Sequence, residues 1–400
     1  MNNETRKETQ VLPKDVRYVG ADDLTLPLFE NQYPVQPMGV SYNSYLILDE
    51  KVAVMDSVDA RAADEWLAKL AHELDGRRPD YLVISHMEPD HSGSILCLAE
   101  RYPEMQLVGN AKTFAMLRQF FGAKAPTDDR LLEVGEGETL PLGAHTLHFM
   151  LAPMVHWPEV MVAYEETEKL LFSADAFGRF GALSRTAAAP WAPQARRYYY
   201  NIVGKYGAQV QALLKKASAL EIETICPLHG PVLTGGALGE ALRLYDLWSR
   251  WQSESPDDIL LAHASIHGNT ARAAELFKQK LEAKGARVTL CDLTTTEVSY
   301  AVANAFYCGK LVLACSTYDG GLFPPMEEFL SHLQAKGFRS RTVGLMENGS
   351  WAPAAARLMR AKLEEMKDLR VCGTVVSLRS ALSPASEAQI DALTTELCAK

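Results

Sequence analysis

Four side chains that can bind a metal ion lie within six positions of one another in the segment SHMEPDHSGS, residues 85–94. They follow the apolar run YLVI, and they are His86, Glu88, Asp90 and His91. Imidazole nitrogen and carboxylate oxygen are common ligands of zinc and iron in proteins. The alternative to a metal site is a polar turn that leads into a helix N-cap at Ser92 or Ser94.

Three more segments of the first half place side chains of the same two kinds at a strand end. His156 follows the strand-like HFMLAP, Asp175 ends KLLFSAD, and His229 ends ETICPLH. Each of these histidines alone would more often be a core or surface residue than a ligand. Loops at one end of a sheet can bring separated segments together, so the combination predicts a metal site. His145 and His148 lie inside a predicted strand and are not expected to bind metal.

A second kind of site is indicated after the strand ILLAHAS, residues 259–265, where the loop SIHGNT leads into a helix predicted from Ala271. Backbone N–H groups and hydroxyls at a helix N-terminus favour an anion such as phosphate. A Gly-Asn-Thr turn is also a common helix start, and the position of the loop, first in its domain, favours the phosphate site. The residues of this candidate phosphate loop are Ser265, Ile266, His267, Gly268, Asn269 and Thr270.

Two later strand-end segments, CSTYDGGLFPPM and MENGSWAP, each place an aromatic residue among small ones. A flat ring system needs an aromatic side chain to stack on and backbone close enough to bond its polar edge. Tyr318 and Trp351 are the candidates for stacking, although Trp351 could also be an ordinary packing residue. The candidate contacts are Ser316, Thr317, Tyr318, Asp319, Gly320, Gly321, Asn348, Gly349, Ser350 and Trp351.

The two sets of candidate residues fall in halves with different patterns. The polar, Pro-containing segment 248–258 separates them, and we expect domains at 1–255 and 256–400. The first half mixes strands and helices, including a hairpin over 42–58, which predicts a layered α/β or α+β domain. The second half alternates strand and helix regularly, which is typical of a doubly wound parallel sheet that binds ligands at the carboxyl ends of its strands.

Composition limits the classes of function. The 400 residues, 48% of them hydrophobic and 22% charged, indicate a soluble globular protein of two domains. A net charge of −10 gives no overall attraction to nucleic acid or to an anionic membrane. The polar start lacks the apolar segment of a secretory signal, and no apolar run approaches the roughly 20 residues that cross a bilayer. We therefore expect a cytoplasmic protein.

The seven cysteines are scattered, and no two have the C-x-x-C spacing of an iron–sulfur, zinc-ribbon or rubredoxin site. Their odd number and wide spacing also argue against a disulfide framework. Most are expected to be small buried core residues.

The motif H-x-E-x-D-H resembles the H-x-H-x-D-H metal motif of the metallo-β-lactamase superfamily, with Glu88 in place of the second histidine. A carboxylate is a harder ligand than imidazole and shifts the preference from zinc towards iron or manganese. Together with PMVHWP and SADAFG, this variant resembles the flavodiiron proteins, or A-type flavoproteins. The resemblance implies an N-terminal metallo-β-lactamase-like αββα sandwich with two irons. One iron would be held by His86, Glu88, His156 and Asp175, and the other by Asp90, His91, His229 and the bridging Asp175.

The second half resembles the flavodoxin-like domain of the same family, which implies one FMN. Residues 265–270 would bind its phosphate, and residues 316–321 and 348–351 would flank its isoalloxazine ring. His267 stands where flavodoxins often have a hydroxyl residue, so one phosphate contact is lost or replaced by imidazole.

The resemblance implies reduction of oxygen to water, of nitric oxide to nitrous oxide, or both, with no catalytic residue beyond the metal ligands. Electrons would come through FMN from an external donor, a rubredoxin or a reduced deazaflavin. A head-to-tail homodimer, or a dimer of dimers, would bring the FMN of one chain beside the irons of the other. The alternatives are a zinc hydrolase with a flavodoxin-like appendage, which Glu88 disfavours, and a non-catalytic electron carrier, which the seven ligands disfavour.

Overall fold

The computed structural model describes residues 12–399. The chain divides into two compact units between Asp246 and Leu247. This division falls within helix α8 (Gly235–Ser249), a few residues before the domain boundary expected at 255/256. The exact boundary remains a prediction.

The first unit contains two six-stranded sheets. The strands of the first sheet are, in spatial order, β1 (Val16–Tyr18), β6 (Tyr45–Ile47), β7 (Ala53–Met55), β8 (Tyr81–Val83), β9 (Gln106–Gly109) and β10 (Leu131–Glu133). Those of the second are β11 (Thr139–Pro141), β12 (Thr146–Leu151), β13 (Met161–Glu165), β14 (Leu170–Phe172), β15 (Thr224–Cys226) and β16 (Leu233–Thr234). Two small hairpin-like pairs lie outside the sheets: β2 (Ala21–Asp23) with β5 (Val40–Tyr42), and β3 (Leu28–Phe29) with β4 (Tyr33–Pro34).

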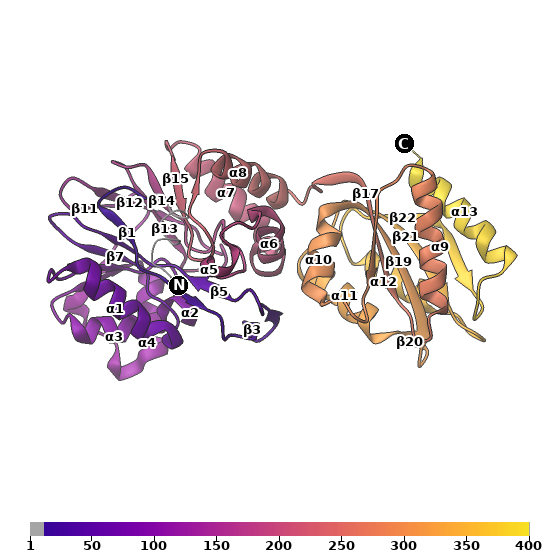
Figure 1. Ribbon diagram of the computed structural model, residues 1–400, viewed down its shortest axis with the longest axis horizontal. Coiled ribbons are helices and arrows are strands. Elements are labelled where there is room, and N and C mark those ends of the chain that lie inside the picture. The colour runs from indigo at the N-terminus through magenta and orange to yellow at the C-terminus, as the bar shows by residue number, and fades with distance from the viewer. Residues whose placement is uncertain (1–11, 400) are drawn as a thin grey trace. The chain divides into compact units, whose positions relative to one another are not determined.

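Buried side chains of both sheets form one apolar cluster, which includes Val83 of β8, Phe149 of β12 and Phe172 of β14. Helices cover the outer faces of the two sheets (Figure 1). The helices of this unit are α1 (Ala63–Leu74), α2 (Pro89–Ser92), α3 (Ile95–Arg101), α4 (Ala111–Phe121), α5 (Leu183–Thr186), α6 (Trp191–Tyr198), α7 (Gly207–Ala217) and α8. This arrangement confirms the αββα sandwich.

The second unit is built on a parallel sheet of order β18-β17-β19-β21-β22. Every neighbouring pair on this path is parallel, and in chain order it reads 2-1-3-4-5, the order of the flavodoxin-like fold. The bounds are β17 (Ser255–Ala264), β18 (Val288–Asp292), β19 (Cys308–Tyr318), β21 (Thr342–Asn348) and β22 (Arg370–Leu378), with the short β20 (Gly321–Leu322) paired to β19.

Helices cover both faces of this sheet. Side chains of α9 and α13 form an apolar cluster with the sheet, and α10 and α11 lie on its other face (Figure 1). The helices are α9 (Asn269–Ala283), α10 (Val298–Tyr307), α11 (Pro324–Ala335), α12 (Ala355–Glu364) and α13 (Pro384–Cys398). The doubly wound parallel sheet is confirmed.

Two predicted boundaries differ from the structure. Helix α9 begins at Asn269, not Ala271, because Gly268 takes the left-handed conformation, with φ of 85°, that turns the chain directly into the helix. Strand β17 begins at Ser255, before the predicted start at 259, because the polar segment pairs with Cys308 across an irregularity in register.

Two further observations bear on the predicted class of protein. Cys226, Cys291, Cys308, Cys315 and Cys372 are buried, as expected of core residues, whereas Cys97 is exposed. Within residues 12–399, the helices are all too short or too polar to span a bilayer.

Candidate metal and flavin sites

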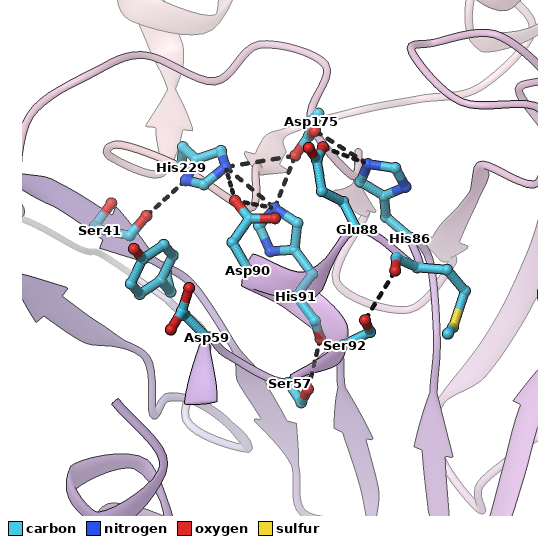
Figure 2. Close-up of polar contacts among 12 residues, drawn as sticks. Ser41, Ser57, Asp59, His86, Glu88, Asp90, His91, Ser92, Asp175 and His229 are labelled. Carbon is cyan, nitrogen blue, oxygen red and sulfur yellow. Dashed lines mark hydrogen bonds and ion pairs between the residues drawn. The ribbon is translucent and has the colours of Figure 1, made fainter. Parts of the chain in front are cut away.

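The segment after β8 delivers four of the candidate metal ligands. His86 follows the strand, and Asp90 and His91 lie in the single turn of α2, which begins with Pro89 at its first position, where proline is favoured. The Ser92 hydroxyl donates to the carbonyl of Met87 at 2.8 Å and thereby closes the segment on itself. Figure 2 shows the carboxylates and imidazoles of this segment pointing toward Asp175 and His229.

The other three candidates come from the second sheet. His156 lies between β12 and β13, Asp175 follows β14, and His229 follows β15. Two non-glycine residues beside Asp175, Ala174 and Phe177, have φ of 52° and 67°. Such left-handed conformations are uncommon for these residues and persist where the surrounding structure enforces them, which is frequent at functional sites.

The first group consists of one ligand atom each from His86, Glu88, His156 and Asp175, all within 4.8 Å of one another. His156 Nε2 lies 3.0 Å from Glu88 Oε2 and 3.1 Å from Asp175 Oδ2. His86 Nε2 lies 3.3 Å from the same Glu88 oxygen. Two ring nitrogens and two carboxylate oxygens therefore face a common point.

The second group consists of Asp90, His91 and His229, again within 4.8 Å. His91 Nε2 lies 3.1 Å from His229 Nε2, and His229 Nε2 lies 3.3 Å from Asp90 Oδ2. Asp175 joins this group through its other oxygen, since Oδ1 lies 3.1 Å from His91 Nε2 and 3.7 Å from His229 Nε2. Asp175 thus directs one oxygen to each group.

The tautomers of two histidines follow from their outer contacts. His86 Nδ1 lies 2.7 Å from Glu159 Oε1, and His229 Nδ1 lies 2.7 Å from the carbonyl oxygen of Ser41. A carboxylate and a carbonyl can only accept, so each Nδ1 carries the proton and each Nε2 keeps its lone pair. The lone pairs are therefore directed into the two groups, as metal binding requires.

The electrostatics of the two groups favour a bound cation. Burial alone would raise the pKa of Asp175, but the neighbouring imidazoles of His91 and His86 hold that pKa well below its usual range. Burial lowers the pKa of His156, yet its hydrogen bonds to Asp175 and Glu88 outweigh this and raise the pKa to about 9. A metal ion can replace the protons that these carboxylates attract to the imidazoles.

Several buried oxygen atoms lack the hydrogen bonds that burial normally demands. They include both carboxylate oxygens of Asp90, Oδ1 of Asp175 and the hydroxyl of Tyr198. Leaving a buried acceptor without a partner costs about 1–3 kcal/mol, and more for a charged group. Metal ions would satisfy the carboxylates, and a set of nitrogen and oxygen donors without sulfur suits non-haem iron. The residues present fit a pair of irons.

The three loops of the candidate flavin site meet at the carboxyl edge of the parallel sheet. The hydroxyls of Thr270, at the start of α9, and Ser316, in β19, lie 2.9 Å apart. The side-chain amide of Asn348, at the end of β21, donates to Thr270 Oγ1 at 3.2 Å. Gly268 N–H donates to the Ser265 hydroxyl at 3.1 Å, which shapes the candidate phosphate loop.

Apolar side chains are exposed at this edge, which is uncommon for groups of their size. Ile266, Tyr318 and Trp351 are 38%, 44% and 88% exposed. Gly349 allows close packing here, because a Cβ at this position would lie 2.6 Å from the Pro353 Cα atom. An exposed aromatic pair on two adjacent loops is the surface that a flat ring system would cover.

Comparisons with known proteins match both halves of the chain. The family described as ODP family beta lactamase matches residues 40–230. Rubredoxin-oxygen oxidoreductase of Megalodesulfovibrio gigas is 27% identical over 87% of this chain and 87% of its own length, and nitric oxide reductase of Moorella thermoacetica is 27% identical over 88% of each. The flavodiiron protein of Giardia intestinalis aligns over 97% of this chain and 95% of its own, with a TM-score of 0.88 and 25% identity. Over nearly its whole length this chain is similar to flavodiiron proteins.

The seven side chains named from the sequence as ligands lie in the two groups described above. His145 and His148 lie elsewhere, and they contact Asp49 and Glu166 instead. The role of the seven side chains as ligands, and of the loop residues as flavin contacts, remains a prediction.

The sequence analysis missed Glu159, which contacts His86. A carboxylate three residues after His156 was a signal that could have been noticed, because metal-binding histidines commonly donate their second N–H to a carboxylate. The carbonyl of Ser41 gave no such signal, since every residue has one.

Proposed function

We propose that this protein is a flavodiiron protein that reduces oxygen to water, nitric oxide to nitrous oxide, or both, at a pair of non-haem irons supplied with electrons through FMN. The observation that carries this proposal is the position of Asp175, whose two oxygens face two separate groups of ligands. A mononuclear zinc site would need one such group. Relatives named rubredoxin-oxygen oxidoreductase and nitric oxide reductase support an oxidoreductase over a hydrolase or an electron carrier.

Each iron would be held by a nearly equal set of donors. His86, Glu88, His156 and Asp175 would hold one, and Asp90, His91, His229 and Asp175 the other. Reduction of oxygen to water takes four electrons, of which the iron pair and FMN would each supply two, whereas two nitric oxides take two in all. The protein's own part is to place and orient these ligands in a buried site.

The charge of the ligand set suits this chemistry. The carboxylates of Glu88, Asp90 and Asp175 carry −3 against the +4 of two ferrous ions. A small positive remainder in a buried site favours a neutral diatomic substrate that becomes anionic as it accepts electrons. The ligand set is shared by the two gases, so it does not choose between them.

The loops at the edge of the second sheet would bind FMN. Residues 265–270 would hold the phosphate at the N-terminus of α9. Residues 316–321 and 348–351 would flank the ring, with Tyr318 and Trp351 available for stacking. The exposed position of both aromatic side chains supports this assignment.

The electron donor and the assembly belong to the same proposal. The chain has no C-x-x-C pair, so the donor is an external protein or cofactor, a rubredoxin or a reduced deazaflavin. A head-to-tail homodimer, or a dimer of dimers, would bring the FMN of one chain to the irons of its partner.

Gas consumption by the iron- and FMN-loaded protein tests the proposal. With reduced rubredoxin under anaerobic conditions, we expect added oxygen or nitric oxide to be consumed catalytically. His86→Ala should abolish consumption while its FMN stays bound and reducible, because His86 lies in the first unit only. Consumption of neither gas, together with hydrolysis by the zinc-loaded protein, would contradict the proposal.

A further inference from the structure

Glu159 lies in the loop between β12 and β13 and is almost fully buried, with 1% of its surface exposed. Its Oε1 atom accepts from His86 Nδ1 at 2.7 Å and from the backbone N–H of Met87 at 2.9 Å. One carboxylate oxygen therefore accepts hydrogen bonds from both the ring of His86 and the backbone of the next residue. Glu159 therefore acts on the first ligand group through the ring of His86.

Glu159 is itself held in place from outside. Its carbonyl oxygen accepts from the side-chain amide of Asn110 at 2.6 Å. The Asn110 side-chain oxygen in turn accepts from the N–H groups of Lys112 and Thr113, which caps helix α4. Asn110 thus connects the backbone of Glu159 to the N-terminus of helix α4.

The contact distinguishes His86 from the other candidate ligands. His229 donates its Nδ1 proton to the neutral carbonyl of Ser41, and His91 Nδ1 has no hydrogen-bond partner in the described part of the chain. Of the outer hydrogen bonds described for the four histidines, the one from His86 alone reaches a carboxylate. An anionic acceptor fixes the tautomer and makes the imidazole a stronger donor than a carbonyl does.

We propose that Glu159 is a positioning residue that raises the iron affinity of the first group, His86, Glu88, His156 and Asp175, relative to the second. The inference rests on the proposed function, since it assigns a role toward bound iron. One loop then serves this group twice: it supplies His156 as a ligand, and three residues later it orients His86. Loss of the Glu159 charge weakens one iron position and leaves the other intact.

Two substitutions separate the parts of this role. Glu159→Gln keeps an acceptor oxygen for His86 and Met87 but removes the charge, and Glu159→Ala removes both. Glu165→Gln is the matched control, because Glu165 is equally buried and accepts from the N–H groups of Thr167 and Glu168 at 2.9 and 2.7 Å, away from the ligands. Any general effect of a buried amide in place of a carboxylate will appear in the control as well.

The measurement is anaerobic titration of the metal-free, FMN-loaded full chain with ⁵⁷Fe²⁺ against a competing chelator, followed by Mössbauer spectroscopy. We expect Glu159→Ala to weaken one of the two irons about 10–100-fold, the range found when outer partners of metal ligands are removed. Glu159→Gln should weaken the same iron less, and Glu165→Gln should match the wild type. One of two iron signals should change, with FMN content and the melting temperature of the metal-free protein like those of the control.

The other outcomes overturn the inference. Wild-type affinity for both irons in Glu159→Ala and Glu159→Gln would show that the contact has no role in metal binding. Equal weakening of both irons, with a melting temperature lowered well beyond that of Glu165→Gln, would show a role in folding alone. A wild-type protein that binds no iron would instead refute the proposed function, which this titration reveals separately.

Discussion

Asp175 is the central residue of the proposed site, because it is the one side chain that belongs to both ligand groups. Its Oδ2 lies 3.1 Å from His156 Nε2 and its Oδ1 lies 3.1 Å from His91 Nε2. It is 1% exposed, so its charge lies almost wholly inside the protein. Ala174, directly before it, has a left-handed backbone conformation, with φ of 52°.

Asp175→Asn should therefore affect both irons at once. The amide keeps one oxygen but loses the charge and the second oxygen, so we expect iron affinity at both positions to fall by at least about 100-fold. Iron content after gel filtration and the Mössbauer spectrum check this, with FMN content as the control. Loss of one iron alone would show that Asp175 is not shared.

At the scale of elements, the sequence was sufficient to predict which strand ends carry the side chains that gather in the two groups. Apolar runs mark the buried strands, and donors placed directly after them, such as Asp175 and His229, must lie at a sheet edge. The regular strand–helix alternation likewise predicted the parallel sheet of the second unit.

Features set by long-range packing could not be predicted in this way. Helix α9 begins two residues early because of the conformation of Gly268, and β17 begins early because its polar start pairs with β19. The contact between Glu159 and His86 joins residues 73 positions apart. The position of Glu159 three residues after His156 could suggest a role near the ligands, but it does not say which histidine the carboxylate contacts.

The turn between β6 and β7 is hydrogen-bonded to a second loop, and this contact can be tested. Asp49 Oδ2 accepts from the N–H and the ring Nδ1 of His145, at 2.7 and 2.8 Å, and so connects this turn to the loop before β12. Burial would raise the pKa of Asp49, but these bonds and the N–H of Glu50 lower it from 3.8 to about 2.

Asp49→Asn should lower the free energy of unfolding by about 2 kcal/mol at neutral pH. The reason is that the pKa of the mostly buried Asp49 carboxyl is lower in the folded protein than in the unfolded chain, so folding favours its charged form. The lowered pKa means that this stabilisation is fully present above about pH 4 and is lost as the pH falls through 2. Urea unfolding from pH 7 down to pH 3 should show the difference from the wild type shrinking below pH 4. Asp129→Asn, at an exposed position, is the control, and a difference that does not change with pH would contradict the account.

At the scale of the whole molecule, the proposal places metal ligands in one unit and flavin contacts in the other, and electrons must pass between them. A head-to-tail dimer makes that path run from one chain to its partner. Two variants that are each expected to be inactive test this directly. His86→Ala removes a proposed iron ligand, and Gly349→Ala places a Cβ 2.6 Å from the Cα atom of Pro353 in a candidate flavin loop.

Coexpression of the two variants should restore activity if electrons cross between chains. A mixed dimer then has one intact pair of FMN and irons, and random pairing gives about a quarter of wild-type gas reduction. Tagged purification of mixed dimers, with each variant alone as control, measures this. No recovery in a mixed dimer would indicate that electrons stay within one chain.

Metal and flavin analysis of the anaerobically purified protein tests the central claim most directly. The account predicts about two irons and one FMN per chain, with the irons coupled as a pair in the Mössbauer spectrum. Stoichiometric zinc in place of iron, in a protein that consumes neither oxygen nor nitric oxide, would contradict it.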